Sequence, residues 1–262
     1  MDEKTVLMEV TGSIGKLTFN RPNVLNAYNQ DVSETLIQGI NALAADDSVR
    51  VIVITGTGKA FMAGADINMV NGWADQGGVS KIRASLKKMF TPNMLEMCPK
   101  PIIAAVNGLA FGMGCEIAMG CDYRIAASNA KFALPEIKLG ILPGAGGSQR
   151  MLHLVGATRA LEMITTGDPI DAAEAFRIGL VNQVVDGEAL WEAVEAFAAR
   201  LTDKSAHALK TAKQLIYQGG SLPLYDGVDY ERDRFCEILL TEDAAEGTRA
   251  FLEKRKPVFK GK

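Results

Sequence analysis

Two glutamates stand in apolar stretches where a charged side chain is costly. Glu116 lies in the run GCEIAM and Glu136 in the run ALPEI. A buried carboxylate must be neutralised or hydrogen-bonded, and apolar surroundings raise its pKa toward the range useful to a general acid or base. The two glutamates are therefore a candidate acid–base pair. The alternative is two structural carboxylates, bonded to Arg124 or to a helix N-terminus.

Glycine-rich turns stand near these carboxylates and suggest a second chemical device. One turn is Ala63-Gly64-Ala65 and the other is Gly112-Met113-Gly114. A helix that starts directly after such a turn presents unpaired backbone N–H groups, and its dipole favours negative charge. Two donors from two turns could stabilise one oxyanion. The sequence thus predicts a substrate carbonyl that becomes an enolate, with carboxylates moving protons and no metal.

Other common catalytic arrangements lack support. There is no G-x-S-x-G motif, and a catalytic triad would need His153 or His207, of which His153 lies in a predicted helix. GMGCEI fails the dinucleotide fingerprint at its third glycine, and GAGGS lacks the Lys-Ser/Thr ending of a P-loop. The four cysteines form no C-x-x-C pair, so a zinc site is not expected.

Alternating strands and helices must position these groups. Residues 5–20 predict two strands joined by a turn, and residues 30–45 predict a helix from apolar residues at helical spacing. The runs 49–55, 101–106 and 123–127 predict buried strands. The first two are each followed by a turn and a similar segment, AFMAGADI and AFGMGCEI, which indicates a weak internal repeat of strand, turn and helix. The fold class is therefore α/β.

The rest of the chain divides by composition. Residues 67–98 are polar and methionine-rich, and they predict a partly helical surface loop or lid. From about Gly187 onward, alanine, leucine and charged residues predict helices that end in a basic tail. We therefore expect a core over residues 1–190 and a helical region over residues 191–262.

Composition excludes several classes of partner. The 262 residues carry 28 basic and 31 acidic side chains, for a net charge of −3, which argues against nucleic acid or an anionic membrane as partner. No apolar run is long enough for a transmembrane helix, and the polar Met1–Lys4 predicts no secretory signal.

Unpaired cysteines favour a reducing compartment, so a cytoplasmic protein is expected. The 26 glycines make up about a tenth of the 262 residues, above the average share of about 7%, and we expect them at particular turns.

The chain resembles the crotonase family, and most closely its enoyl-CoA hydratases, over almost its whole length. The motifs that carry the resemblance are FNRPNVLNAYN (residues 19–29), KAFMAGADI (59–67), KPIIAAVNGLAFGMGCEIAMGCDYRIA (100–126), FALPEIKLGILPGAGGSQRM (132–151) and FLEKRKPVF (251–259). The resemblance implies a spiral of ββα repeats followed by a C-terminal helical region that mediates trimerisation, with two trimers often stacked as a hexamer.

The resemblance also implies roles for individual residues. The oxyanion hole falls on the backbone N–H groups of Ala65 and Met113, where methionine replaces the glycine common in the family. Glu116 would deprotonate water and Glu136 would protonate C2. Coenzyme A would contact Ala27, Ala63, Asp66, Ile67 and Gly144. The candidate partners of its phosphates are Arg21, Lys59 and lysines of the tail.

The implied reaction is reversible syn addition of water to a 2-enoyl-CoA, as in fatty acid β-oxidation. No cofactor is expected, because coenzyme A is part of the substrate. An isomerase, or a hydratase of cyclic or substituted enoyl-CoA, is the alternative within the family. A non-catalytic member that binds RNA or a protein partner is disfavoured by the retained glutamate pair and by the missing basic excess.

Overall fold

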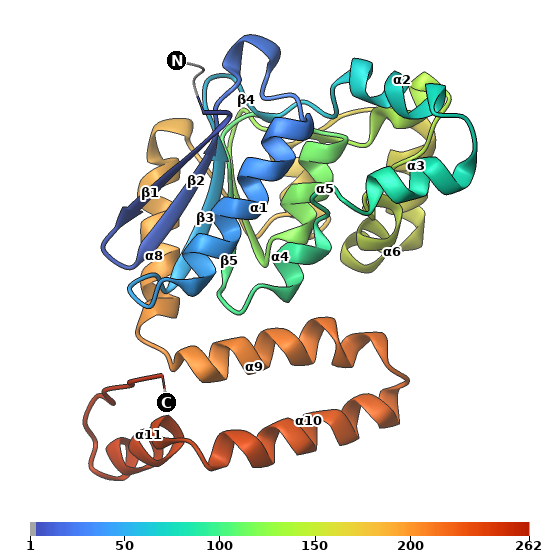
Figure 1. Ribbon diagram of the computed structural model, residues 1–262. Helices are drawn as coiled ribbons and strands as arrows, with labels where there is room; N and C mark the ends of the chain where they lie inside the picture. The colour runs from blue at the N-terminus through green and yellow to red at the C-terminus, as the bar shows by residue number, and fades with distance from the viewer. Residues whose placement is uncertain (1–3, 262) are drawn as a thin grey trace.

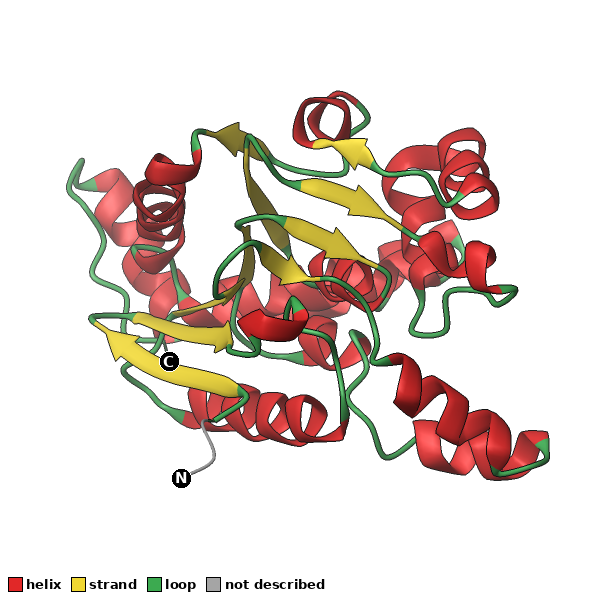
Figure 2. Cartoon of the chain, turned by 90° about the horizontal axis from the view of Figure 1, so that it is seen from above, coloured by secondary structure: helices red, strands yellow, loops and turns green. Residues whose placement is uncertain are grey.

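The strands of the computed structural model, which describes residues 4–261, form two sheets (Figure 2). The larger sheet has the order β1-β2-β3-β5-β7-β10 and the smaller one the order β4-β6-β8-β9. The strands of the larger sheet are β1 (Val6–Thr11), β2 (Ile14–Phe19), β3 (Val51–Gly56), β5 (Ile102–Val106), β7 (Tyr123–Ala127) and β10 (Gln183–Val185). Those of the smaller sheet are β4 (Ala60–Met62), β6 (Leu109–Phe111), β8 (Lys131–Ala133) and β9 (Ile170–Asp171).

The predicted repeat of strand, turn and helix is confirmed, and it occurs three times. The first strand of each repeat (β3, β5, β7) enters the larger sheet, and the second (β4, β6, β8) enters the smaller one, all parallel to their counterparts. Helices follow each pair. This is the spiral of ββα repeats that the family resemblance implied, and it stacks equivalent turns next to one another.

The central strands are apolar because both faces of the larger sheet are covered. Ile52 and Ile54 of β3 belong to the main core, which α1 (Gln30–Ala45) covers, whereas Val51 and Val53 face a second cluster with α8 (Leu190–Thr202). All four side chains are fully buried. The predicted helix over residues 30–45 is therefore confirmed as one cover of the sheet.

Residues 67–98, predicted as a partly helical surface loop or lid, form three short helices. These are α2 (Ile67–Asp75), α3 (Val79–Leu86) and α4 (Asn93–Met97). In Figure 1, α2 and α3 project to one side of the sheets, while α4 packs beside α5 (Met113–Gly120). The long helix α6 (Gly147–Thr166) changes direction at Gly156, which has non-helical backbone angles.

The C-terminal part is helical, as predicted. It consists of α8 followed by α9 (Ala206–Tyr217), α10 (Leu224–Leu239) and α11 (Glu242–Leu252). Figure 1 shows that α9, α10 and α11 form a separate layer below the sheets, whereas α8 packs on the larger sheet. The division at residue 190 stays a prediction, and α8 on its C-terminal side belongs to the packing of the core.

The remaining elements are short. They are α7 (Ala172–Arg177) and the 3-10 helices η1 (Pro22–Val24), η2 (Pro135–Leu139), η3 (Gly187–Ala189) and η4 (Gly219–Ser221). None of the helices between residues 4 and 261 is both long and apolar enough to cross a membrane. The absence of a secretory signal was predicted from the polar segment Met1–Lys4, of which residues 1–3 lie outside the described residues.

Candidate active site

The two glycine turns singled out in the sequence lie against each other. Gly64 and Gly112 both have positive φ angles, 111° and 50°. A Cβ added to Gly112 would lie 3.5 Å from Cα of Gly64 and 3.1 Å from Oε1 of Glu136. A larger residue at position 112 would therefore be strained and crowded. The parallel pairing of β4 with β6 brings the two turns together, and the Glu136 carboxyl lies beside Gly112.

The backbone N–H of Ala65 is left without an acceptor by its local pairing. Tyr28 forms a parallel bridge with Ala65, in which the Tyr28 N–H donates to the Gly64 carbonyl (2.9 Å) and the Asp66 N–H donates to the Tyr28 carbonyl (2.8 Å). The bridge thus uses the neighbours of Ala65 and not its own N–H. Within residues 4–261 this N–H has no hydrogen-bond acceptor.

Met113 is the first residue of α5, so its N–H precedes the helical hydrogen-bond ladder. Like that of Ala65, it has no acceptor in the described part of the chain. The Gly112 N–H, by contrast, donates to the Ala133 carbonyl at 3.0 Å and fixes the start of the helix. The Met113 side chain is buried in the main core. Both predicted oxyanion donors are therefore present at adjacent turns, on a helix N-terminus in the case of Met113.

Glu116 lies in the first turn of α5 and is 3% exposed. Its Oε1 accepts hydrogen bonds from the N–H groups of Ala145 and Gly147, both at 2.8 Å. Gly147 begins α6, so the carboxylate sits at a helix N-terminus, where the helix dipole favours its charge. Burial raises the pKa of Glu116, while these two hydrogen bonds and the charge of Arg150 oppose the rise.

Arg124, the other structural partner considered for Glu116, is engaged elsewhere. Its guanidinium group donates to the carbonyls of Leu180 (2.6 Å), Cys121 (2.6 Å) and Ala118 (3.2 Å). Arg124 follows the end of α5 closely, so it reaches the carbonyls of the last helical turn and not the first turn that carries Glu116. Of the two structural alternatives, only the helix N-terminus applies, and it leaves Oε2 of Glu116 without a hydrogen bond in the described chain.

Glu136 is half-buried in η2. Its Oε2 is buried and has no hydrogen-bond partner among the described residues. Burial, and secondarily the negative charge of Glu116, raise the pKa of Glu136 from 4.5 to about 7. Both carboxyls therefore have raised pKa values, but backbone donors and Arg150 counter the effect of burial only at Glu116. A pair in different environments of this kind suits a division into acid and base.

The predicted coenzyme A contacts lie on two adjoining loops. The Ala63 N–H donates to the Leu25 carbonyl (3.0 Å), which places Ala63 beside the loop that carries Ala27. Asp66 caps α2 by accepting from the Asn68 N–H at 3.1 Å, and Ile67 beside it is 51% exposed. Ala27, Ala63, Asp66 and Ile67 therefore lie on two loops that are hydrogen-bonded to each other.

Gly144 and the basic residues predicted to face the phosphates of coenzyme A do not lie together. Gly144 is exposed in the loop before α6 and directly precedes Ala145, the first donor of the hydrogen-bonded turn at Ala145 and Gly147. Arg21 already donates to the Ala27 carbonyl and lies 3.9 Å from Asp66, while Lys59 is exposed. The described part of the C-terminal tail, up to residue 261, lies at the end of the molecule opposite α2 (Figure 1), so the chain does not bring Lys254, Lys256 or Lys260 to these loops.

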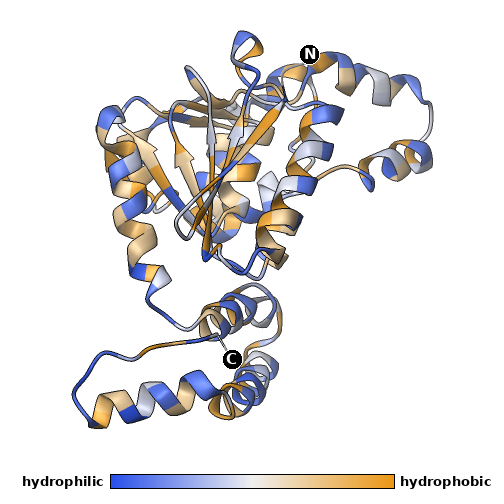
Figure 3. Cartoon of the chain, turned by 60° about the vertical axis from the view of Figure 1, so that its left-hand side comes forward, coloured by the Kyte–Doolittle hydropathy of each residue, from blue (hydrophilic) through white to orange (hydrophobic). Residues whose placement is uncertain are grey.

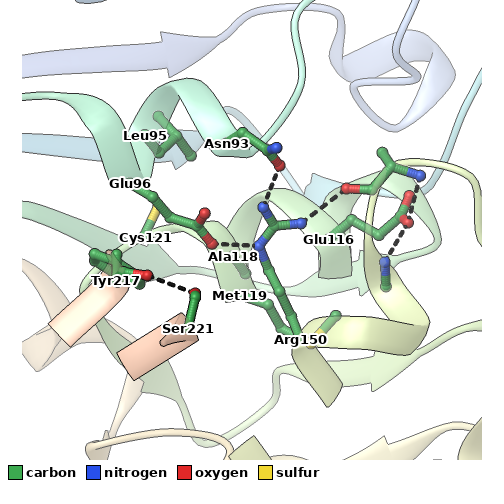
Figure 4. Close-up of polar contacts among 12 residues, drawn as sticks. Asn93, Leu95, Glu96, Glu116, Ala118, Met119, Cys121, Arg150, Tyr217 and Ser221 are labelled. Atoms are coloured by element: carbon green, nitrogen blue, oxygen red, sulfur yellow. Dashed lines mark hydrogen bonds and ion pairs between the residues drawn. The ribbon is translucent and has the colours of Figure 1, made fainter. Parts of the chain in front are cut away.

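Arg150 is a site residue that the sequence reasoning missed. It lies in the first turn of α6 and contacts Glu96, Asn93 and the Ala145 carbonyl (Figure 4). A cation in the first turn of a helix opposes the helix dipole. That unfavourable position, visible in the motif GGSQRM, was the signal that could have identified Arg150.

Asn26 is a second missed residue. It is fully buried with a φ of 59°, and its side-chain amide donates to the carbonyls of Ala60 (2.8 Å) and Thr57 (3.0 Å). Asn26 thereby fixes the loop of Ala27 against the strand that leads to Ala63. An asparagine tolerates positive φ, but nothing local in the sequence marks its distant partners.

Comparisons with known proteins agree with this geometry. A family model described as enoyl-CoA hydratase/isomerase matches residues 9–262. The chain is 42% identical over 260 residues to a crotonyl-CoA hydratase of Syntrophomonas wolfei, with 99% of each chain covered. It is 41% identical over 246 residues to the 2,3-dehydroadipyl-CoA hydratase of Escherichia coli, with 94% of each covered. The crystal structure of an enoyl-CoA hydratase from Bacillus anthracis superposes with a TM-score of 0.90 at 35% identity, covering 98% of this chain and all of that one.

Proposed function

Because the chain belongs to the enoyl-CoA hydratase/isomerase family, we propose that Glu116 and Glu136 are the acid–base pair with which it hydrates an enoyl thioester. Its activity is that of an enoyl-CoA hydratase, a hydro-lyase that adds water across the 2,3 double bond of a 2-enoyl-CoA. The residue assignment rests on one observation: Gly112 lies next to both Gly64 and the Glu136 carboxyl.

The oxyanion hole consists of the N–H groups of Ala65 and Met113. In the reaction, the thioester oxygen accepts from both donors, and negative charge grows on it as the enolate forms. Preorganised donors stabilise that charge without reorganisation, which is worth about 3–4 kcal/mol for one donor in comparable sites. The absence of an internal acceptor for either N–H between residues 4 and 261 supports this role.

The carboxyls divide the proton transfers. Glu116, which accepts hydrogen bonds from the Ala145 and Gly147 N–H groups, takes a proton from the water whose oxygen bonds to C3. Glu136, with a pKa of about 7, gives its proton to C2 of the enolate. The product is the 3-hydroxyacyl-CoA, and the two carboxyls end with their proton exchanged. Reversal by the same path gives dehydration.

Hydration is favoured over isomerisation, because an isomerase needs only one group that moves a proton between carbons. Two carboxyls in different environments, one bound by backbone donors and one without a partner, match the addition of water instead. The identity of the acyl group is a separate matter. The relatives named for crotonyl-CoA and 2,3-dehydroadipyl-CoA differ greatly in their acyl chains, so a cyclic or substituted substrate stays an alternative.

The test follows the absorbance of the conjugated thioester in water with a panel of short, long, branched and cyclic enoyl-CoAs. Decay is expected with at least one member. Glu116→Gln and Glu136→Gln should each lower the rate by roughly 10²–10⁴-fold, the usual value of general acid–base catalysis. If both variants are folded and fully active, the assignment of the pair is wrong.

The coenzyme A moiety is proposed to lie over Ala27, Ala63, Asp66 and Ile67, with Gly144 near the reacting end. Enoyl-CoA hydratases in general need no cofactor, and the mechanism above uses only water and side chains of this chain. A cytoplasmic location is proposed because all four cysteines are free thiols, three of them buried.

A homotrimer, or a dimer of trimers, is proposed from the C-terminal helices. Large apolar side chains stay exposed on them in the single chain, and orange segments are visible there in Figure 3. They include Leu224, Tyr225, Phe235, Leu240, Phe251 and Leu252. Exposed apolar surface of this kind marks a protein interface. Light scattering should give three or six times the chain mass of 28.1 kDa, and a monomer would contradict the proposal.

A further inference from the structure

The guanidinium group of Arg150 joins three partners from two separate segments (Figure 4). Its Nε donates to Oε1 of Glu96 at 2.6 Å, and one Nη donates to Oδ1 of Asn93 at 2.6 Å. The other Nη donates to the Ala145 carbonyl at 2.9 Å. The Arg150 and Glu96 side chains are 12% and 20% exposed, so the ion pair is largely withdrawn from solvent.

These contacts form a chain that ends at Glu116. Asn93 and Glu96 lie on α4, and they hold Arg150 at the start of α6. Arg150 in turn holds the carbonyl of Ala145, whose N–H donates to Glu116 Oε1. The Glu116 carboxylate is therefore connected to α4 through hydrogen bonds that pass by way of Ala145 and Arg150.

The loop that carries these links needs an external support. It contains three glycines, and one of them, Gly146, has a φ of 98°. Glycine-rich backbone has many accessible conformations, so the loop does not fix the N–H groups of Ala145 and Gly147 by itself. A planar guanidinium group with several donors can hold a carbonyl, a carboxylate and an amide at fixed angles at once, which a lysine cannot.

We propose that Arg150, anchored by Glu96 and Asn93 of α4, is a positioning residue that holds the 144–147 loop and thereby aims the Glu116 carboxylate at the attacking water. This inference rests on the proposed role of Glu116. It assigns to α4, the last part of the 67–98 segment, a task in catalysis without contact with the reacting atoms.

The charges near Glu116 give this role a specific signature. The charged groups are Glu136 on η2 and Arg150 on α6, while Glu96 on α4 acts through Arg150. The buried Cys115 thiol on α5 itself stays neutral, because burial raises its pKa strongly. The positive charge of Arg150 opposes the rise in the pKa of Glu116 that burial causes. Removal of that charge therefore raises the pKa of Glu116 and moves the acidic limb of the pH–rate profile to higher pH.

The experiment compares Arg150→Met, Arg150→Lys and Glu96→Gln with the wild-type enzyme, using crotonyl-CoA or the best substrate of the panel. Arg150→Met should lower kcat by roughly 10²-fold, the cost expected for a small misplacement of a catalytic group, with KM little changed. Arg150→Lys should also lower kcat but keep the wild-type acidic limb, since it keeps the charge and loses the planar group. Arg159→Met is the matched control, because Arg159 is on the same helix and pairs with the exposed Glu162.

A double-substitution cycle distinguishes positioning from an independent effect. In the Glu116→Gln background, Arg150→Met should cause little further loss, because its effect passes through Glu116. Equal losses in both backgrounds, or a raised KM with unchanged kcat, would overturn the inference. If Arg150→Met fails to fold, the isosteric Glu96→Gln in the same cycle decides. A fully active Glu116→Gln would instead refute the proposed function, and the inference with it.

Discussion

Glu136→Gln should stabilise the folded protein at alkaline pH while it abolishes most of the activity. The folded-state pKa of Glu136 is about 7, whereas an ordinary glutamate has 4.5. At 1.36 kcal/mol per pKa unit, its neutral form is favoured by roughly 3 kcal/mol more than in a solvated glutamate. Near pH 7 about half of the molecules carry the proton, against about 0.3% for an ordinary glutamate.

The sign of the stability effect follows from proton binding. Between pH 4.5 and 7 the folded state binds more protons at Glu136 than the unfolded state does. Its ionisation therefore lowers the free energy of unfolding progressively as the pH rises through this range, and the decrease is complete above about pH 7. Glutamine does not titrate, so the variant does not show this decrease. The variant should thus gain about 2 kcal/mol of unfolding free energy, relative to wild type, between pH 5 and pH 8.

The assay is urea unfolding of wild type and Glu136→Gln at pH 5 and pH 8, beside hydration rates from the enoyl thioester absorbance. The exposed Glu195 of α8 supplies the control variant Glu195→Gln. A stability difference that is the same at both pH values would refute the raised pKa. A folded Glu136→Gln with wild-type activity would refute the role of Glu136 as the proton donor.

Three further substitutions test the site and its support. Gly147→Ala should lower kcat by about tenfold or more, because the new Cβ would lie 2.9 Å from Glu116 Oε1, and steady-state kinetics measures this. Met113→Gly should remain active, since the backbone donor persists, but the acyl preference should change across the substrate panel. Lys213→Met should lower the unfolding free energy by about 3–5 kcal/mol in urea unfolding, because it leaves the buried Asp122, now 2.8 Å from Lys213, unpaired.

Each of these has an outcome that would contradict it. Gly220 has open space around the position of a Cβ, so Gly220→Ala is the control for Gly147→Ala, and equal kinetics for both would show that Glu116 tolerates the crowding. A folded but inactive Met113→Gly would mean that the methionine side chain takes part in the reaction. An unchanged unfolding free energy in Lys213→Met would mean that α9 does not depend on the ion pair.

Several features of the site could be predicted from the sequence, because each depends only on neighbouring residues. Glycine was expected at Gly64 and Gly112 as part of helix-starting turns, and both have the positive φ that favours glycine. Glu116 and Glu136 stood out because a carboxylate among apolar residues is costly. The β-branched runs predicted strands buried on both faces, and β3 and β5 are such strands.

The hydrogen bonds that support Glu116 and Arg150 could not be predicted from the sequence, because they join residues that are far apart in the chain. Ala145 and Glu116 are 29 positions apart, and Arg150 and Glu96 are 54 apart. No periodicity or motif relates such pairs. The exclusion of Arg124 as the partner of Glu116 likewise needed the direction in which its side chain leaves β7.

The sequence by itself determined the repeating strands and helices, the two glycine turns and the two costly carboxyls, because propensity, periodicity and burial act over a few neighbouring residues. Only the tertiary structure decided that the two turns meet, that Glu116 binds at the start of α6 and that Arg150 ties this loop to α4. Those decisions depend on how parallel strands bring separate repeats side by side, and the free energy of such packing is distributed over contacts that no local segment contains.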